Sequence, residues 1–214
     1  MRYTNIFFDL DDTLYPVQAG LWEAIRSRMS RYMAERMGLP VEQIDALRKH
    51  YLETYGTTLR GLQHNYHIDS DDYLAYVHDL PLDKFIQPDP AVRQMLLSLP
   101  LQRWIFTNAD SQHAQRVLTT LELEGCFHGI IDVRAIGFLN KPDPLAYQRA
   151  LEIAGVSDPR TCVLLDDAAR NLGPARQMGF TTVLVNPTYQ NNSAEYHIHT
   201  IRELPKILPE LWLE

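Results

Sequence analysis

The sequence is poor in cysteine, in long apolar runs and in positive charge, and each shortage removes a class of protein. Its two cysteines, Cys126 and Cys162, are too few for a disulfide framework and form no CxxC pair of the kind that binds structural zinc. Asp9, Asp11 and Asp12 interrupt the apolar run near the N-terminus, so this run does not resemble a secretory signal. No stretch reaches the ~18–20 apolar residues of a membrane span. We therefore expect a cytoplasmic protein without a membrane partner.

Basic residues are outnumbered, with 20 Lys and Arg against 27 Asp and Glu and a formal net charge of −7. A polymeric nucleic acid is a poor candidate partner, because binding its phosphates normally requires a basic face. A small anionic substrate stays possible where local cations offset the charge. With 214 residues and 45% hydrophobic residues, the chain is too apolar to be disordered. It can form one sizeable core, alone or with a small second domain. No feature of the sequence specifies an oligomeric state.

Short apolar runs rich in β-branched and aromatic residues predict buried strands. They lie at Ile6–Phe8, Trp104–Phe106, Cys162–Leu165 and Thr182–Val185, with a weaker candidate at Ile130–Ile131. Because each run is apolar throughout rather than alternating, both faces of the sheet should be covered, as in a parallel sheet.

Helical periodicity separates these runs. Helices are predicted at Ala91–Leu99, Ser111–Leu121, Asp143–Ala154 and Ala168–Met178, and a short one at about Ile201–Leu208. Gly179 follows the fourth of them as a natural helix terminus. Strands and helices that alternate in this way predict an α/β fold, with a Rossmann-like parallel sheet built by right-handed crossovers.

Residues 17–85 have a different pattern, with no convincing buried strand. Apolar residues recur there at helical spacing, first between Leu21 and Met33, then between Ile44 and Tyr55, and again at Tyr73, Tyr76 and Val77. We interpret residues 17–85 as a helical domain inserted after the first strand, with residues 1–16 and 86–214 forming the α/β core. The alternative is that these helices only cover the sheet.

Polar groups follow three of the predicted strands. They are Asp9, Asp11 and Thr13 after the first, Thr107 and Asn108 after the second, and Asp166 and Asp167 after the third; Lys141 precedes a helix. Ligands of open α/β sheets bind beyond the carboxyl ends of the strands, so these groups should meet in one crevice.

Several carboxylates in one crevice repel one another and raise one another's pKa. A hard cation with oxygen ligands removes that conflict, and Mg²⁺ is commonly bound by one or two carboxylates together with water and a substrate phosphate. A nearby Lys and a hydroxyl suit a phosphate better than a neutral ligand. The residues therefore predict a magnesium and phosphate site.

Four motifs resemble those of the haloacid dehalogenase (HAD) superfamily phosphatases. The sequence Asp9-Leu10-Asp11-Asp12-Thr13 resembles the first, Ile105-Phe106-Thr107-Asn108 the second, Lys141-Pro142-Asp143-Pro144 the third, and Leu164-Leu165-Asp166-Asp167 followed by Asn171 the fourth. All four occur in the order of the family. The resemblance implies a HAD-like α/β core with an inserted helical cap that covers the site.

The resemblance also implies catalytic roles. Asp9 would be the nucleophile that forms an aspartyl-phosphate, and Asp11 would protonate the leaving group and then activate water. Thr107 and Lys141 would bind the phosphoryl oxygens. For Asn108 a phosphate-binding role and a turn-forming role are both open.

The implied Mg²⁺ ligands are the side chains of Asp9 and Asp167 and the backbone carbonyl of Asp11. Asp167 falls on the ligand position of the family when the following helix is aligned. Asp166 would be either a second ligand or a supporting partner. Asn171 would orient the acidic loop.

Asp11 also separates subgroups of the superfamily, because the dehalogenases lack a second Asp two residues after the nucleophile. The sequence therefore favours a phosphomonoester hydrolase. A phosphomutase carries the same four motifs and stays open. A catalytically idle domain that binds a nucleotide or a protein is a third possibility, which the complete acidic and basic set disfavours.

The segment Tyr55–Leu62 and the opening Asp12–Pro16 resemble the pyrimidine 5'-nucleotidase branch. The resemblance implies a small phosphorylated substrate, with a nucleoside 5'-monophosphate, pyrimidine preferred, as the first candidate. A sugar phosphate is the alternative. Arg60 is a candidate specificity residue that could face a phosphate or a base carbonyl, and a solvated surface role is equally open for it.

Overall fold

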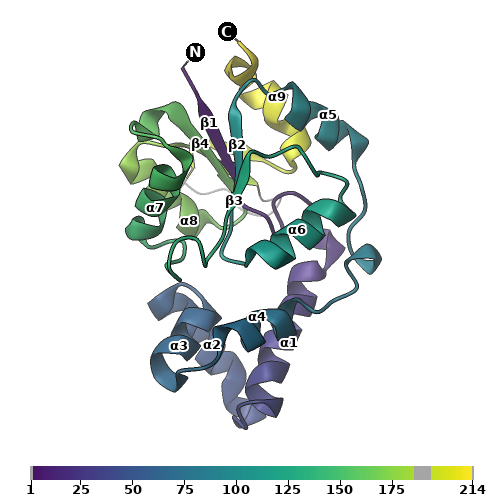
Figure 1. Cartoon of the computed structure of the whole chain (residues 1–214), viewed down its shortest axis with the longest axis vertical. Coiled ribbons are helices and arrows are strands. Elements are labelled where there is room, and N and C mark those ends of the chain that lie inside the picture. The colour runs from purple at the N-terminus through teal and green to yellow at the C-terminus, as the bar shows by residue number, and fades with distance from the viewer. Residues whose placement is uncertain (1, 186–193, 214) are drawn as a thin grey trace.

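A computed structural model describes residues 2–185 and 194–213. Figure 1 shows an upper part that contains the strands and both chain ends, and a lower part made only of helices. Strand β1 runs from the N-terminus toward the helical part, so that part lies beyond the carboxyl ends of the strands. In the described residues, no helix is long and apolar enough to cross a membrane.

One sheet organises the upper part, with strand order β3-β2-β1-β4-β5-β6 and parallel pairing throughout. Its strands are β1 (Asn5–Phe8), β2 (Gln102–Phe106), β3 (Gly129–Ile131), β4 (Cys162–Asp166), β5 (Thr181–Val185) and β6 (Tyr196–Ile198). The predicted parallel α/β sheet is confirmed, including the strand at Ile130–Ile131. The apolar pattern of the sequence does not predict β6, because this strand is only three residues long and partly exposed.

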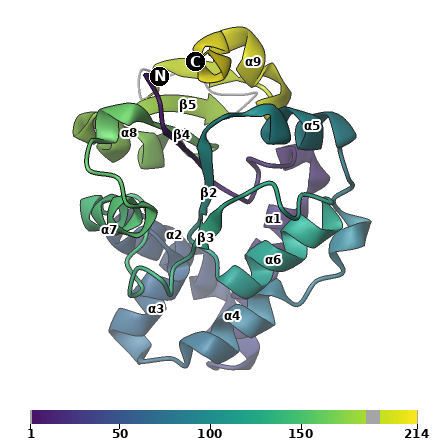
Figure 2. The same cartoon turned by 45° about the horizontal axis from the view of Figure 1, so that its top comes forward.

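Helices cover both faces of the sheet. They are α5 (Pro90–Ser98), α6 (Ser111–Thr120), α7 (Pro144–Ala154), α8 (Ala169–Met178) and α9 (Leu204–Ile207). Figure 2 shows α7 and α8 on one side of the strands and α5 and α6 on the other. Asp89, Asp110 and Asp143 accept hydrogen bonds from first-turn backbone N–H groups, which explains where three of these helices begin.

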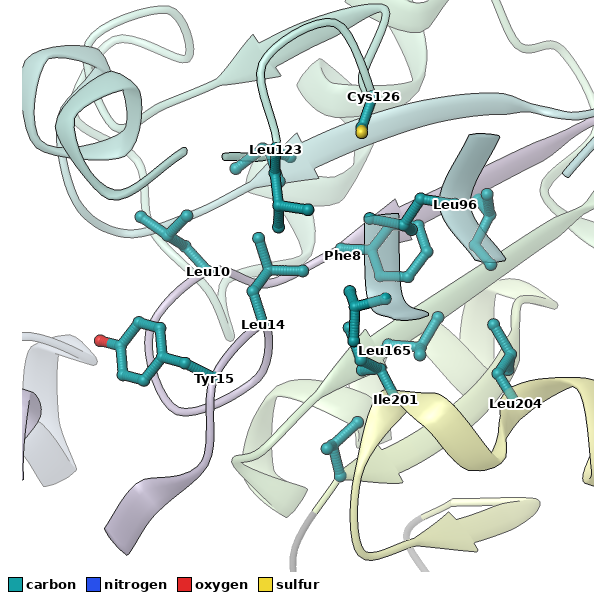
Figure 3. Close-up of a cluster of buried hydrophobic side chains, with 14 of the residues drawn as sticks. Phe8, Leu10, Leu14, Tyr15, Leu96, Leu123, Cys126, Leu165, Ile201 and Leu204 are labelled. Atoms are coloured by element: carbon teal, nitrogen blue, oxygen red, sulfur yellow. The ribbon is translucent and has the colours of Figure 1, made fainter. Parts of the chain in front are cut away.

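Alternate residues of the strands supply the two halves of the core. Phe8 and Leu165 pack with α5 and α9 in the cluster that Figure 3 shows, whereas Phe7 and Leu164 pack on the opposite face with α7 and α8. Burial on both faces explains why the strands are continuously apolar.

The lower part consists of α1 (Leu21–Glu35), α2 (Val41–Tyr55), α3 (Thr58–Tyr66) and α4 (Ser70–His78). These four helices share a separate hydrophobic cluster, with Tyr32, Tyr51 and Tyr73 among its buried members. The first turns of α1 differ, because Leu21 and Ile25 pack with the cluster of the sheet. The boundaries of the inserted domain at residues 17 and 85 stay a prediction.

Two local features differ from the sequence pattern. Helix α3 is not predicted by that pattern, because its glycine and polar residues obscure the helical period. The predicted single helix at Ile201–Leu208 is divided into a 3-10 turn at Ile201–Glu203 followed by the short α9. Pro205 causes the division, since it lacks the N–H that would bond to the carbonyl of Ile201.

Candidate active site

The end of β1 places the first acidic motif at the centre of the sheet edge. Phe8 lies in register with Ile105 on β2 and with Leu165 on β4, so the residues after these three strands emerge side by side. The backbone N–H of Asp9 still bonds to the carbonyl of Leu165 at 2.9 Å. The chain then turns sharply at Asp12, whose φ of 58° is left-handed, a conformation that Asp tolerates better than most residues.

Lys141 is the central cation of the site and is fully buried. Its Nζ donates to Asp9 Oδ1 at 2.7 Å, to Asp166 Oδ2 at 2.7 Å and to the carbonyl oxygen of Phe106 at 2.8 Å. An ammonium group has three hydrogens, and each of them has an acceptor here. The predicted convergence of the first, third and fourth motifs is therefore present.

Asn108 and Thr107 follow β2 next to this cation. The Asn108 side chain accepts from the backbone N–H of Lys141 at 2.8 Å and donates to its carbonyl at 3.0 Å. Asn108 thus fixes the loop that carries Lys141. The buried Thr107 hydroxyl oxygen accepts from the backbone of Ala109 at 3.0 Å, which leaves its hydrogen available for donation.

The two adjacent acids of the fourth motif differ in their surroundings. Asp166 has no exposed surface and accepts four hydrogen bonds, from Lys141, from the backbone of Ala168 and twice from Asn171. Asp167 is half-buried. Oxygens of Asp9, Asp166 and Asp167 lie within 4.8 Å of one another.

Because these carboxylates are close together and shielded from water, their ionised forms are unfavourable without a further cation. Burial raises the pKa of Asp9 to about 7, although the Lys141 charge opposes the shift. Burial and the neighbouring Asp166 and Asp9 raise the pKa of Asp167 to about 9. Burial and Asp11 raise the pKa of Asp12 to about 7, and its Oδ1 is buried without a hydrogen-bond partner among the described residues. An all-oxygen set with surplus negative charge fits a hard divalent cation.

Asp11 is held from a different direction. Its Oδ1 accepts from the Tyr15 hydroxyl at 2.6 Å and lies 2.9 Å from Nε2 of His113. Burial raises the pKa of Asp11, but the contacts with His113 and Tyr15 outweigh burial and lower it overall. His113 is not among the residues that the sequence motifs predict for the site. A histidine in the first turn of the helix after the second motif was the available signal.

The C-terminal end of helix α2 contacts the loop that carries Lys141, where Asn140 Nδ2 donates to the carbonyl of Tyr55 at 3.1 Å. A Cβ on Gly56 would lie 2.3 Å from Asn140 Nδ2 and 3.2 Å from the Lys141 carbonyl oxygen. Arg170 Nη1 donates to the carbonyls of Leu52 at 3.2 Å and Gly56 at 3.1 Å. Arg60 lies in the first turn of α3 with an exposed side chain, and its role stays a prediction.

Comparison with known proteins agrees with this arrangement. The family of haloacid dehalogenase-like hydrolases matches residues 3–179. Phosphate metabolism protein 8 of Saccharomyces cerevisiae is 29% identical over 192 residues, which cover 83% of this chain and 60% of the yeast protein. The chain thus spans less than two thirds of the length of that relative.

Solved structures share the fold. YfnB of Bacillus subtilis, in a structure bound to magnesium, aligns with a TM-score of 0.64 and 19% identity over 97% of this chain and 99% of its own. L-2-haloacid dehalogenase from Xanthobacter autotrophicus, with chloropropionic acid covalently bound, aligns with a TM-score of 0.61 and 17% identity over 97% and 98%. At these identities the likeness extends to the fold and not to the substrate.

Proposed function

This chain belongs to the haloacid dehalogenase-like hydrolases, and we propose that it is a Mg²⁺-dependent phosphomonoester hydrolase with a nucleoside 5'-monophosphate, pyrimidine preferred, as its substrate. One observation carries the proposal. Lys141 joins Asp9 to Asp166 through two hydrogen bonds of 2.7 Å, with Asp167 beside them. The residues proposed as nucleophile, as phosphate-binding cation and as metal ligands therefore lie close together at one sheet edge, which supports the proposal.

In the first step, an Asp9 oxygen attacks the phosphorus atom of the substrate. The bond between phosphorus and the leaving-group oxygen breaks, and Asp11 donates a proton to that oxygen. The positive charge of Lys141 and the Thr107 hydroxyl, whose hydrogen is available for donation, would offset the charge that develops on the phosphoryl group. The product is an aspartyl-phosphate on Asp9 and a free alcohol.

In the second step, Asp11 takes a proton from water, and the water oxygen attacks the phosphorus atom. The bond to the Asp9 oxygen breaks, which regenerates the carboxylate and releases inorganic phosphate. Asp11 acts as acid and then as base, and the proton taken from water is the one that it donates in the next cycle. Because the contacts with His113 and Tyr15 lower the pKa of Asp11 in the free protein, the acid step requires the negative charge of the nearby phosphate to raise that pKa.

Asp9, Asp167 and the backbone carbonyl of Asp11 would bind Mg²⁺, which supplies Lewis-acid neutralisation of the phosphoryl oxygens when bound. The difference between the two acids of the fourth motif supports this ligand set. Asp166 uses both oxygens in four hydrogen bonds, so it supports Lys141 and Asn171 rather than a metal.

The nucleotide preference rests on the resemblance of the cap segment Tyr55–Leu62 to the pyrimidine nucleotidases. The structure adds a physical reason for a cap role, because the Tyr55–Gly56 end of α2 contacts the loop of Lys141. Arg60 lies in the same sequence segment, in the first turn of α3, and would meet the part of the substrate that leaves.

The test is phosphate release from a panel of UMP, CMP, purine nucleotides and sugar phosphates, with Mg²⁺ and with a chelator. We expect Mg²⁺-dependent release that is fastest with UMP or CMP, and no release by Asp9→Asn. Activity that survives chelation or Asp9→Asn would refute the mechanism. Equal rates on sugar phosphates would refute the substrate preference alone. Isomerisation of a sugar phosphate without phosphate release would show a mutase.

A further inference from the structure

The two carboxylate oxygens of Asp11 differ in their contacts with the rest of the protein. Both the Tyr15 hydroxyl and the His113 ring contact Oδ1, at 2.6 and 2.9 Å. Within residues 2–185 and 194–213, no hydrogen bond to Oδ2 is present. The carboxylate is therefore anchored through one oxygen, and the other oxygen is the one available for proton exchange.

The surroundings of His113 fix which ring nitrogen carries the hydrogen. The ring is fully buried, and its Nδ1 has no hydrogen-bond partner among the described residues. A hydrogen on Nδ1 would be buried without an acceptor, which is costly, whereas a hydrogen on Nε2 points at Asp11 Oδ1. The hydrogen on Nε2 is therefore the one that makes the contact with Asp11.

Neighbouring groups keep both donors in place. The ring of His78, the last residue of α4, stacks on the ring of His113 with centroids 4.1 Å apart and an angle of 14° between their planes. The backbone N–H of His113 is bonded to Asp110 at 2.9 Å. The Tyr15 ring packs against the sheet cluster while its hydroxyl points away from the labelled apolar side chains, as Figure 3 shows.

We propose that His113 is a positioning residue that, together with the Tyr15 hydroxyl, anchors Asp11 through Oδ1 and so presents Oδ2 to the leaving group and to water. The inference rests on the proposed function, because it assigns a task to the acid–base residue of that reaction. A stacked, buried ring with one fixed donor is suited to orientation rather than to proton transfer.

The experiment compares a poor and a good leaving group in wild type and in three variants. His113→Leu removes the donor, Tyr15→Phe removes the other, and His113→Gln keeps an N–H near the position of Nε2. kcat/KM is measured for an alkyl phosphate, UMP, and for p-nitrophenyl phosphate, whose weakly basic leaving group needs little protonation. This parameter reports the steps up to the first irreversible one and so isolates the first proton transfer.

For His113→Leu we expect a loss of about 10- to 100-fold on UMP and less than about 3-fold on p-nitrophenyl phosphate, because general acid catalysis contributes about 10²–10⁴-fold and only its alignment is disturbed. Tyr15→Phe should show the same selective loss, and His113→Gln should recover most of it. The exposed His199→Leu is the matched control and should leave both rates unchanged.

Equal losses on both substrates, or a loss that His113→Gln does not reduce while its melting temperature equals that of wild type, would overturn the positioning role. Thermal melts identify a variant that fails to fold. If a His113 variant fails to fold, the test is whether Tyr15→Phe loses more kcat/KM on UMP than on p-nitrophenyl phosphate. The proposed function fails separately, if wild type hydrolyses neither substrate in Mg²⁺.

Discussion

Lys141 Nζ lies 2.7 Å from Oδ1 of Asp9, although the two residues are 132 positions apart in the chain. The contact is buried, and the same ammonium group also binds Asp166. Lys141 therefore links the proposed nucleophile to the acidic loop of the fourth motif. Because Lys141 has both a proposed role in catalysis and several buried hydrogen bonds, it is the first target for mutation.

Lys141→Met should destabilise the protein by about 3–5 kcal/mol near neutral pH, because removing one partner leaves buried carboxylates without compensation. Urea unfolding measures this loss. Saturating Mg²⁺ should recover part of the stability, since a cation between the carboxylates replaces some of the lost charge. A loss below about 1 kcal/mol without metal would contradict the described ion pairs.

In the absence of metal, the free energy of unfolding, measured by urea unfolding, should decrease as the pH rises from about 4 to about 9. The pKa of Asp167 in the folded state is about 9 and that of Asp9 about 7, against about 3.9 in the unfolded chain, so the folded state retains these protons longer. This contribution to stability is complete below the unfolded pKa and is lost as the pH passes through the folded pKa values.

Mg²⁺ should reverse that trend, because it binds the ionised carboxylates. The increase in melting temperature from chelator to Mg²⁺ should be small near the lower end of this pH window and large near the upper end. Asp167→Asn is the control and should lose most of the increase. If Mg²⁺ raises the melting temperature equally at both pH values, the metal does not bind to these carboxylates.

Asp166→Asn should mainly reduce stability, whereas Asp167→Asn should mainly reduce the affinity for Mg²⁺. Asp166→Asn weakens the contact with Lys141 and disturbs the four hydrogen bonds of a buried carboxylate, so it should lower the free energy of unfolding by about 2–4 kcal/mol. Asp167→Asn should raise the Mg²⁺ concentration for half-maximal activity at least about 10-fold with a smaller stability loss. The reverse pattern would exchange the two roles.

Gly56→Ala should impair activity more than Gly38→Ala. Both glycines have left-handed φ, 82° and 67°, so each substitution costs about 1–2 kcal/mol in backbone strain. Only at Gly56 does the new Cβ meet neighbours, with Asn140 Nδ2 at 2.3 Å, whereas nothing lies within 4 Å at Gly38. Steady-state kinetics should show a lower kcat/KM for Gly56→Ala alone. Equal kinetics for the two variants would argue that the cap contact is not needed.

Strand positions could be read from the sequence because the parallel sheet buries both faces, so that Phe7 and Phe8 both belong to a core. The short edge strand β6 could not, since only Ile198 in it is buried. Helix α3 was missed for a related reason. Gly61 lowers its helical signal, yet the glycine is needed where a Cβ would lie 2.2 Å from the Tyr51 ring.

The acidic groups and Lys141 were predictable because each follows a strand or precedes a helix at the same sheet edge. The contacts of Asp11 were not predictable in this way. His113 lies within a helix and His78 ends another, and only the folded chain brings their rings to 4.1 Å. Asn108 shows a similar limit, since its binding to both backbone groups of Lys141 depends on two loops meeting.

The most direct test of the central claim is an acid-quenched single turnover with a nucleotide whose phosphoryl group is labelled. In Mg²⁺, the wild-type protein should carry the label transiently on a peptide that contains Asp9, and the label should then leave as inorganic phosphate. Asp9→Asn should carry no label and release no phosphate. Phosphate release without a labelled protein, together with an active Asp9→Asn variant, would contradict the aspartyl-phosphate mechanism.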